Sequence, residues 1–292
     1  MADGKRQPCR FKKSACQARS DLRHPVYCAA QPGTHGFHRS QNRQRKHSLP
    51  SLFSLQKNQP EDQRVCPIGD GYNLCVNPYP ILPYHITIPS AEHREQILPA
   101  DFCNTVSTLL NELPDEYALF YNGALCGASA PDHLHFQGVP TEHVPLIAFY
   151  RRTDSGKERL ASISHSSVLH YIDSYVCPLF CIEQCRDGKK DESLFTNIMK
   201  ELPCSNNEPE PKVNILAWQE DEKQIILIIP RCKHRPECYS AEAGKQMLVS
   251  PGTLIWQASL SHRAKKILKR YQPKTSDKFC KKSDCHAKMH RK

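Results

Sequence analysis

The chain has 292 residues, 39% of them hydrophobic, which is enough for one large domain or two small ones with a buried core. Its longest aliphatic run, residues 225–229, is far shorter than the roughly 18 apolar residues that span a membrane, and its first residues lack the apolar segment of a secretory signal. These features argue against an integral membrane protein and against a conventionally secreted one, so no membrane partner is expected.

The net charge of +10 is distributed unevenly along the chain. Residues 1–57 and residues 255–292 each hold 12 Lys and Arg against 2 Asp and Glu, whereas residues 58–254 hold 16 against 26. Such basic ends can bind nucleic acid or another polyanion, and the alternative is that they are solvated, disordered tails. Neither end carries an RNA-binding motif, zinc-finger spacing or interleaved aromatic residues. We therefore expect a disordered basic arm (1–57), an acidic folded body (58–254) and a disordered basic tail (255–292), without a nucleic-acid partner.

The chain contains 15 cysteines, an odd number, and no secretory signal accompanies them. This usage favours a reduced, cytoplasmic protein over a disulfide framework. Cys177, Cys181 and Cys185 have CxxxCxxxC spacing, whereas metal clusters more often use CxxC pairs. We expect these three residues to be small buried hydrophobic residues in a strand or turn.

Hydrophobic periodicity divides the body into strands and helices. Residues 71–89 alternate short apolar segments with Pro-rich turns, which is typical of short strands. Residues 101–113 have an amphipathic helical pattern that Asp101 can cap and that Pro114 ends. Three strand-like segments follow, at 117–123, 133–139 and 145–150.

A second half of the body repeats this organisation. Residues 191–202 have the pattern of an amphipathic helix, and a polar loop continues to Pro211. Residues 213–218 and 224–230 flank a charged turn and indicate a hairpin. We therefore predict an α+β fold of strands with interspersed helices, in two similar halves.

The most informative segment is GASAPDHLHFQ, residues 127–137. His133 and His135 are two residues apart, so in a strand both side chains point to one face, and Gln137 continues that face. The apolar residues between them point the other way, into a core. The segment therefore predicts a row of polar groups on one side of a strand.

Small residues precede the two histidines. Gly127 and Ser129 lie in a segment whose backbone can approach a ligand closely, with N–H and hydroxyl groups that can donate to phosphate oxygens. An isolated His-x-His pair is more often a core or surface pair, or a pair of metal ligands. The complete string favours instead a histidine nucleophile beside a phosphate site, as covalent nucleotidyl transfer requires.

The string GASAPDHLHFQ resembles the active-site motif of the histidine-triad (HIT)-like superfamily, in its branch of nucleotidyltransferases and phosphorylases. That branch includes galactose-1-phosphate uridylyltransferase, diadenosine tetraphosphate phosphorylase and GDP-L-galactose phosphorylase. The sequence is most similar to an uncharacterised group of such proteins from Bacteroides-type bacteria, over roughly residues 56–252, in stretches that include QKNQPEDQ, VNPYPILPYHITIPSAEH and VNILAW. The resemblance implies a HIT-like antiparallel sheet with flanking helices.

The resemblance also implies a role for each polar residue of the motif. His135 would be the nucleophile that carries the nucleotidyl group, and His133 would orient it or help to hold a structural metal. Gln137 would bind the phosphate of the intermediate, in the position where hydrolytic relatives have a third histidine. Because an amide is neither a general acid nor a general base, a transferase or phosphorylase is favoured over a hydrolase.

Further residues are implied to bind the nucleotide or its phosphates. The resemblance assigns Asn122, Gly127 and Ser129 to the phosphate site. It also places Asn77 at the nucleotide, and it places His93 at the start of a helix near the phosphates.

Polar residues of the second half leave two interpretations open. Asn214 interrupts an apolar strand pattern, which suits either a pocket contact or a sheet-edge position. Arg231, Lys233 and His234 follow an apolar strand, where they either hold a phosphate or form a solvated basic turn. His85, within another strand pattern, is expected to be structural.

The chemistry that the resemblance implies requires no cofactor. Relatives tend to carry a CxxC pair, which would form a zinc site, before the similar region, but residues 49–54 contain no cysteine, so no metal ligands are assigned. The expected substrate is a nucleoside-diphosphate sugar or a dinucleoside polyphosphate, and relatives are often homodimers. Both ends depart from the family pattern. The alternative function is therefore a catalytically weak HIT-like protein that binds nucleotides or polyanions through its basic ends.

Overall fold

The computed structural model describes residues 63–254, apart from gaps at 78, 154–156, 165–166, 173, 176, 236–238, 241 and 243–251, with the backbone alone for 157–164. The predicted basic arm at 1–57 and basic tail at 255–292 lie outside these residues. Within the described part of the chain, no helix is both long enough and apolar enough to cross a membrane.

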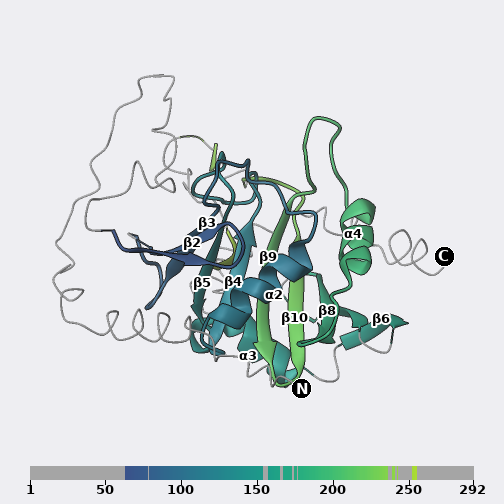
Figure 1. The fold of residues 1–292 in the computed structure, drawn as a ribbon. Helices are drawn as coiled ribbons and strands as arrows, with labels where there is room; N and C mark the ends of the chain where they lie inside the picture. The colour runs from purple at the N-terminus through teal and green to yellow at the C-terminus, as the bar shows by residue number, and fades with distance from the viewer. Residues whose placement is uncertain are drawn as a thin grey trace, which may run out of the picture.

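One ten-stranded antiparallel sheet forms the centre of the fold (Figure 1). Its strand order is β1-β2-β3-β5-β4-β9-β10-β8-β7-β6. The predicted α+β class with an antiparallel sheet is therefore confirmed. The strands are β1 (Val65–Ile68), β2 (Tyr72–Val76), β3 (Ile86–Pro89), β4 (Tyr117–Asn122), β5 (His135–Pro140), β6 (Lys157–Ser164), β7 (Ser167–Ile172), β8 (Leu179–Cys185), β9 (Val213–Glu220) and β10 (Lys223–Pro230).

The sheet consists of two halves with the same topology. From β1 to β5 the chain forms three strands, helix α2 (Phe102–Glu112) and two more strands, and from β6 to β10 it repeats this order around helix α4 (Glu192–Glu201). The equivalent strands β4 and β9 pair with each other in the middle of the sheet. The two similar halves are thus confirmed. The histidine motif has no counterpart in β10, whose sequence is KQIILIIP.

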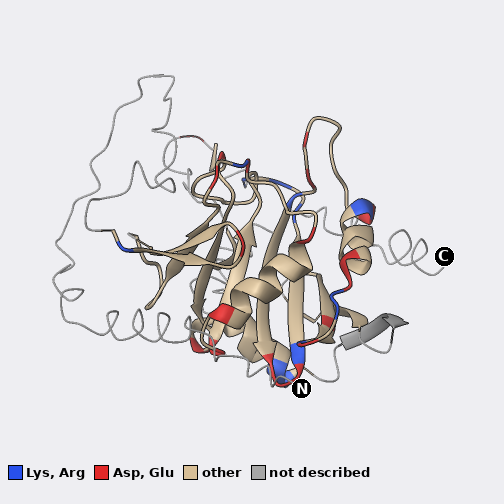
Figure 2. Cartoon of the chain, viewed as in Figure 1, with Lys and Arg blue, Asp and Glu red and all other residues tan. Residues whose placement is uncertain are grey.

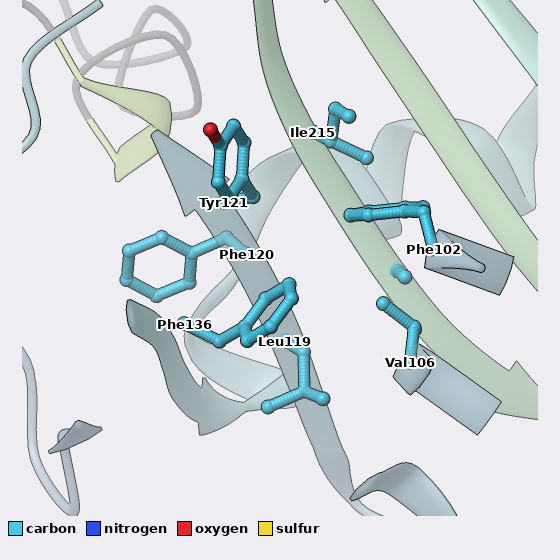
Figure 3. A pocket seen from close by; sticks show the side chains of 8 residues that line it. Phe102, Val106, Leu119, Phe120, Tyr121, Phe136 and Ile215 are labelled. Carbon is cyan, nitrogen blue, oxygen red and sulfur yellow. The ribbon is translucent and has the colours of Figure 1, made fainter. Parts of the chain in front are cut away.

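Helices α2 and α4 pack on the same face of the sheet (Figure 1). Phe102 and Phe195 stack with their ring centroids 4.5 Å apart, which joins the two helices. Figure 3 shows Phe102 and Val106 beside strand residues of both halves, among them Leu119 and Ile215. Each large apolar side chain buried in this way contributes roughly 1.5–3 kcal/mol to stability.

Residues 145–150 form a helix, so the predicted strand there is wrong. Helix α3 (Pro145–Arg152) follows a short 3-10 turn, η3 (Thr141–His143). Pro145 occupies the first helical turn, where the backbone needs no N–H donor. Leu146, Ile147 and Tyr150 then share one helical face and pack on the side of the sheet opposite α2 and α4. Six apolar residues in a row fit a short strand as well as a helix, and packing decides between them.

The predicted helix at 101–113 is confirmed as α2, but its predicted cap is wrong. Asp101 occupies the capping position without a side-chain bond to the helix backbone. Instead, the Glu192 carboxylate of α4 accepts hydrogen bonds from the backbone N–H groups of Cys103 at 3.1 Å and Asn104 at 2.7 Å. A carboxylate at this end also interacts favourably with the helix dipole. The cap therefore comes from a residue distant in the sequence.

Asp191 caps α4, because its carboxylate accepts from the Leu194 N–H at 3.0 Å. We expect Asp191→Ala to lower the free energy of unfolding by about 1 kcal/mol. Asp101→Ala is the matched control and should lower it less, because that carboxylate contacts the Thr105 hydroxyl and no helix N–H. Urea unfolding of both variants measures the difference, and equal losses would contradict this account of the two caps.

Charged residues lie mainly on loops and at the ends of strands (Figure 2). The two strands β9 and β10 carry their charged residues, Glu220 and Lys223, beside the turn that joins them. Of the three spaced cysteines, Cys181 lies in the core under α3 and Cys177 packs against that core. Cys185 is partly buried at the end of β8. The expected role as a small buried hydrophobic residue is therefore confirmed for Cys181, whereas Cys177 and Cys185 are only partly buried.

Candidate active site

The histidine motif begins β5 at the point where both neighbouring strands end. On one side the ladder with β3 reaches His135, which lies opposite Pro89. On the other side the ladder with β4 stops at Gln137, which lies opposite Phe120. The loop that leaves β4 returns to the sheet as the motif. The polar side chains of the motif therefore gather at an end of the sheet where loops meet.

The His135 side chain is held in one tautomer. Its Nδ1–H donates to the backbone oxygen of His133 at 2.9 Å, so Nε2 is unprotonated and carries the lone pair. His135 is 3% exposed, and this burial lowers the pKa of the imidazole although the hydrogen bond to His133 opposes the shift. His135 is therefore neutral near pH 7, and its Nε2 can act as a nucleophile.

Gln137 and His85 direct a donor toward that nitrogen. His85 Nδ1 accepts from the Ile81 N–H at 3.3 Å, so its Nε2–H donates to Gln137 Oε1 at 2.8 Å. The amide nitrogen of Gln137 then faces His135 Nε2 at 3.5 Å. Burial lowers the pKa of His85, which keeps it neutral and preserves this order of donors and acceptors. The side chain of His85, expected to be structural, thus orients Gln137.

His133 lies just before β5 and contacts the segment that follows β3. Its Nε2–H donates to the backbone oxygen of Ser90 at 3.0 Å, and its Nδ1 is 3.2 Å from Nδ1 of His93. The two rings are stacked, 12° from parallel. Burial lowers the pKa of His133, so its neutral ring accepts a hydrogen bond from His93. His133 therefore contacts His135 through its backbone oxygen, while its ring contacts the segment that follows β3.

The pair of His93 and His133 supplies two nitrogens, half of the ligands of a tetrahedral zinc site. Among the residues that the structure describes, no group of three His, Cys, Asp or Glu side chains is arranged to hold a metal ion. The two rings also form a hydrogen bond with each other. The described residues therefore supply two of the four ligands of such a site, and a metal held by His133 stays a prediction.

The loop between β4 and β5 carries the small residues of the motif. Gly127 has φ of +89°, the left-handed region that favours glycine, and it follows a turn closed by the Cys126 N–H and the Gly123 oxygen at 2.7 Å. Ser129 is exposed on the same loop, so its hydroxyl is accessible to a ligand. Their binding of phosphate stays a prediction.

Asn122 and Asn214 lie opposite one another at the centre of the sheet, where β4 pairs with β9. Asn214 Nδ2 donates to Asn122 Oδ1 and to the backbone oxygen of Cys126, both at 2.8 Å. Arg231 donates to Asn214 Oδ1 at 2.8 Å, and Thr253 donates to Asn122 Oδ1 through its N–H and its hydroxyl. Asn214 is fully buried on a central strand, so the sheet-edge interpretation is wrong. Its amide joins the two halves of the sheet and holds the loop just before the glycine.

The basic run after β10 forms a turn around Arg231. Its Nη2 donates to the backbone oxygens of Lys233 at 3.2 Å and His234 at 3.5 Å. These contacts and the bond to Asn214 link Arg231 to its own chain. The Lys233 side chain is exposed, and burial, together with nearby arginines, lowers the pKa of His234. A phosphate contact by these three residues stays a prediction.

A cavity of about 360 Å³ lies against His85 and the loop from β2 to β3. This volume is within the range of small-ligand pockets. Asn77, which the resemblance places at the nucleotide, lines the cavity and donates to Thr87 Oγ1 at 3.0 Å. The lining residues are Val76, Asn77, Pro80, Ile81, Leu82, Pro83, Tyr84 and His85.

Two side chains near the site were not predicted from the sequence. Gln96 lies between β4 and β5 and bonds the backbone of both strands. Glu210, in the loop before β9, accepts from the Leu98 N–H and from the Tyr121 hydroxyl, both at 2.8 Å. Neither residue belongs to a motif, and the partners of each lie far away in the sequence, so no local pattern signals them.

Burial raises the pKa of the Glu210 carboxyl to about 7. Because the folded state then binds this proton more tightly than the unfolded state, the contribution of Glu210 to stability should be largest at low pH and fall as the pH rises from about 4.5 to about 7. Glu210→Gln should remove this decrease, which amounts to about 1–3 kcal/mol. Urea unfolding across this pH range measures the slope, with Glu208→Gln in the same loop as the control that retains it. An unchanged slope in Glu210→Gln would contradict the assignment.

Comparisons with known proteins identify one family and several similar structures. The family described as "Domain of unknown function (DUF4922)" matches residues 41–140, about a third of the chain, which include the motif. No curated protein matches. The chain is similar to the yeast Ap4A phosphorylase Apa2 in complex with Ap4A, at 20% identity over 69% of each chain and a TM-score of 0.45.

Two further similar structures have lower identity. One is an ADP-glucose phosphorylase from Arabidopsis thaliana with bound ADP-glucose, at 14% identity over 75% of this chain and 92% of that chain, with a TM-score of 0.38. The other is a uridylyltransferase, at 11% identity over 80% of this chain and 95% of that chain, with a TM-score of 0.36.

Proposed function

We propose that the chain is a nucleotidyltransferase or phosphorylase in which His135 becomes transiently nucleotidylated. The observation that carries the proposal is the buried, neutral imidazole of His135, whose unprotonated Nε2 lies beside the amide N–H of Gln137. A nucleophile and a donor that meet at one point suit attack on phosphorus, because the donor then stabilises the oxygens of the phosphoryl group. The substrate class is a nucleoside-diphosphate sugar or a dinucleoside polyphosphate.

The reaction proceeds in two displacement steps. In the first, Nε2 of His135 bonds to the α-phosphorus, and the bond to the bridging oxygen breaks, with its electron pair leaving on a sugar phosphate or nucleotide. The backbone oxygen of His133, which accepts from Nδ1–H, stabilises the resulting positive charge on the imidazole. In the second step, an oxygen of inorganic phosphate or of another sugar phosphate bonds to phosphorus. The P–N bond then breaks, and its electron pair returns to Nε2.

The chemistry of Gln137 restricts the leaving group. An amide does not transfer a proton to a departing oxygen, in contrast to a histidine or a carboxylic acid. The leaving oxygen must therefore be stable as an anion without protonation, and a phosphate oxygen meets this condition. Gln137 thus favours phosphoanhydride substrates over esters of poor leaving groups.

The cavity against His85 and the loop from β2 to β3 supports a nucleoside site. His85 lines this cavity and donates to Gln137, which faces His135, so two side chains connect the cavity to the nucleophile. Asn77 lines the cavity as well. A nucleoside held there would bring its α-phosphate toward His135, which is the geometry that productive attack requires.

Intact-mass spectrometry tests the proposal. The purified protein is incubated briefly and separately with ADP-glucose, a GDP-hexose, a UDP-hexose and diadenosine tetraphosphate. A mass gain of one nucleotidyl group is expected with at least one donor, and the donor identifies the base. A folded protein that gains no mass with any donor would contradict the proposal and would favour the catalytically weak alternative.

A further inference from the structure

The side-chain amide of Gln96 lies between β4 and β5 at the level of His135. Its Oε1 accepts from the His135 N–H at 2.8 Å. Its Nε2 donates to the backbone oxygen of Asn122 at 2.9 Å and, over a longer distance of 3.3 Å, to the backbone oxygen of His135. Gln96 is 1% exposed. One primary amide thus bonds the ends of both strands.

This arrangement replaces a direct pairing of the two strands. The ladder between β4 and β5 ends at Phe120 and Gln137. Continued by two residues along each strand, the same register would place Asn122 opposite His135, and their backbone groups would bond each other. The amide of Gln96 stands between them instead. The strands are therefore held apart at the residue that carries the nucleophile.

We infer that Gln96 is a positioning residue for His135. By separating β4 from β5 at this point, its amide sets where the Nε2 of His135 lies relative to the glycine loop that leaves β4. Both strand ends depend on it, because the amide accepts from one strand and donates to the other. The inference rests on the proposed nucleotidyl transfer and adds a residue that the motif does not contain.

Further contacts hold this segment alongside the motif without the Gln96 side chain. The Leu134 N–H donates to the Arg94 oxygen at 2.7 Å, and the Ser90 N–H donates to the Leu134 oxygen at 2.8 Å. Replacing the side chain of Gln96 leaves these bonds in place. A variant at this position therefore removes the amide between the strands and keeps the segment alongside the motif.

Gln96→Met is the test, because it keeps the side-chain length and removes all three hydrogen bonds. Gln224→Met is the matched control, since Gln224 is also fully buried in the sheet and donates to a backbone oxygen, that of Cys103, at 3.2 Å. The rate of mass gain is measured in a single turnover at saturating donor, and donor affinity is measured by titration. We expect Gln96→Met to slow the step by about 10- to 100-fold with little change in affinity, and Gln224→Met to retain the wild-type rate.

Gln96→Glu tests positioning through the pH dependence of the rate, which a purely structural role of Gln96 would not change. When protonated, a carboxyl group offers one acceptor and one donor, as the amide does, whereas the carboxylate offers acceptors alone. The rate of Gln96→Glu relative to wild type at the same pH should therefore rise as the pH is lowered from about 8 to about 6, since burial raises the pKa of a carboxyl group. A constant ratio would count against the inference.

Amide hydrogen exchange separates the inference from the proposed function. Gln96→Met should speed exchange of the His135 amide, because that N–H loses its acceptor, and Gln224→Met should not. Unchanged protection of this amide, or an equal loss of rate in both variants, would overturn the inference. If the wild type gains no mass with any donor, the proposed function fails, and the exchange result still decides whether Gln96 holds the strand.

Discussion

His135→Asn is expected to abolish nucleotidyl transfer while the protein remains folded. The substitution removes the Nε2 lone pair that would bond to phosphorus, and no other side chain in the described part of the motif offers a comparable nucleophile at that point. Loss of an essential nucleophile lowers rates by about 10⁴-fold or more. The measurement is the rate of mass gain in a single turnover with the best donor.

The matched control for this loss is His143→Asn. His143 lies in η3, beyond the opposite end of β5 from His135, and should leave the rate unchanged. The pH dependence of the wild type gives a second check. Because burial lowers the pKa of His135, the rate should be constant near pH 7 and fall only below the ordinary imidazole pKa of 6.5. A His135→Asn variant that still gains a nucleotidyl group at the wild-type rate would exclude His135 as the nucleophile.

Gln137→Glu is expected to slow adduct formation by about 10²- to 10³-fold at neutral pH. The new carboxylate still accepts from His85, but its other oxygen faces His135 Nε2 where the amide N–H stood. A negative charge there favours the protonated imidazole, so the pKa of His135 rises and its lone pair is occupied. The acid limb of the pH–rate profile should therefore move to higher pH.

Gln219→Glu controls for the burial of a new carboxyl group. Gln219 is buried on β9 and donates to Asn111, on the face of the sheet covered by α2. The control should lose stability without a shift of the pH–rate profile. Gln137→Glu with a wild-type profile would show that the amide does not control the protonation of His135.

Local patterns in the sequence predicted the parts of the fold that depend on local periodicity. The 3.6-residue pattern located α2 and α4, and the alternation in HLHFQ placed Leu134 and Phe136 in the core beneath the motif. The repeat of strands around one helix in each half predicted two similar halves. In each case, the residues that determine the structure are close together in the sequence.

The remaining features depend on contacts between distant segments. Helix α3 replaces a predicted strand because one face of PLIAFY packs on the sheet, and the cap of α2 comes from Glu192. Asn214 lies at the centre of the sheet because β9 pairs with β4, and the pattern VNILAW does not predict that pairing. The contacts of Gln96 could not be predicted either, because its amide bonds Asn122 and His135 between two strands that come together only in the folded chain.

The most direct test of the central claim is to locate the adduct. The protein is labelled with the donor that produces a mass gain, digested under mildly alkaline conditions that preserve a P–N bond, and its peptides are sequenced by mass spectrometry. The account predicts one nucleotidyl group, on the peptide that contains residues 133–137, attached to His135 and lost on brief acid treatment. A nucleotidyl group on a lysine, on a serine or on His93, or one that survives acid, would contradict it.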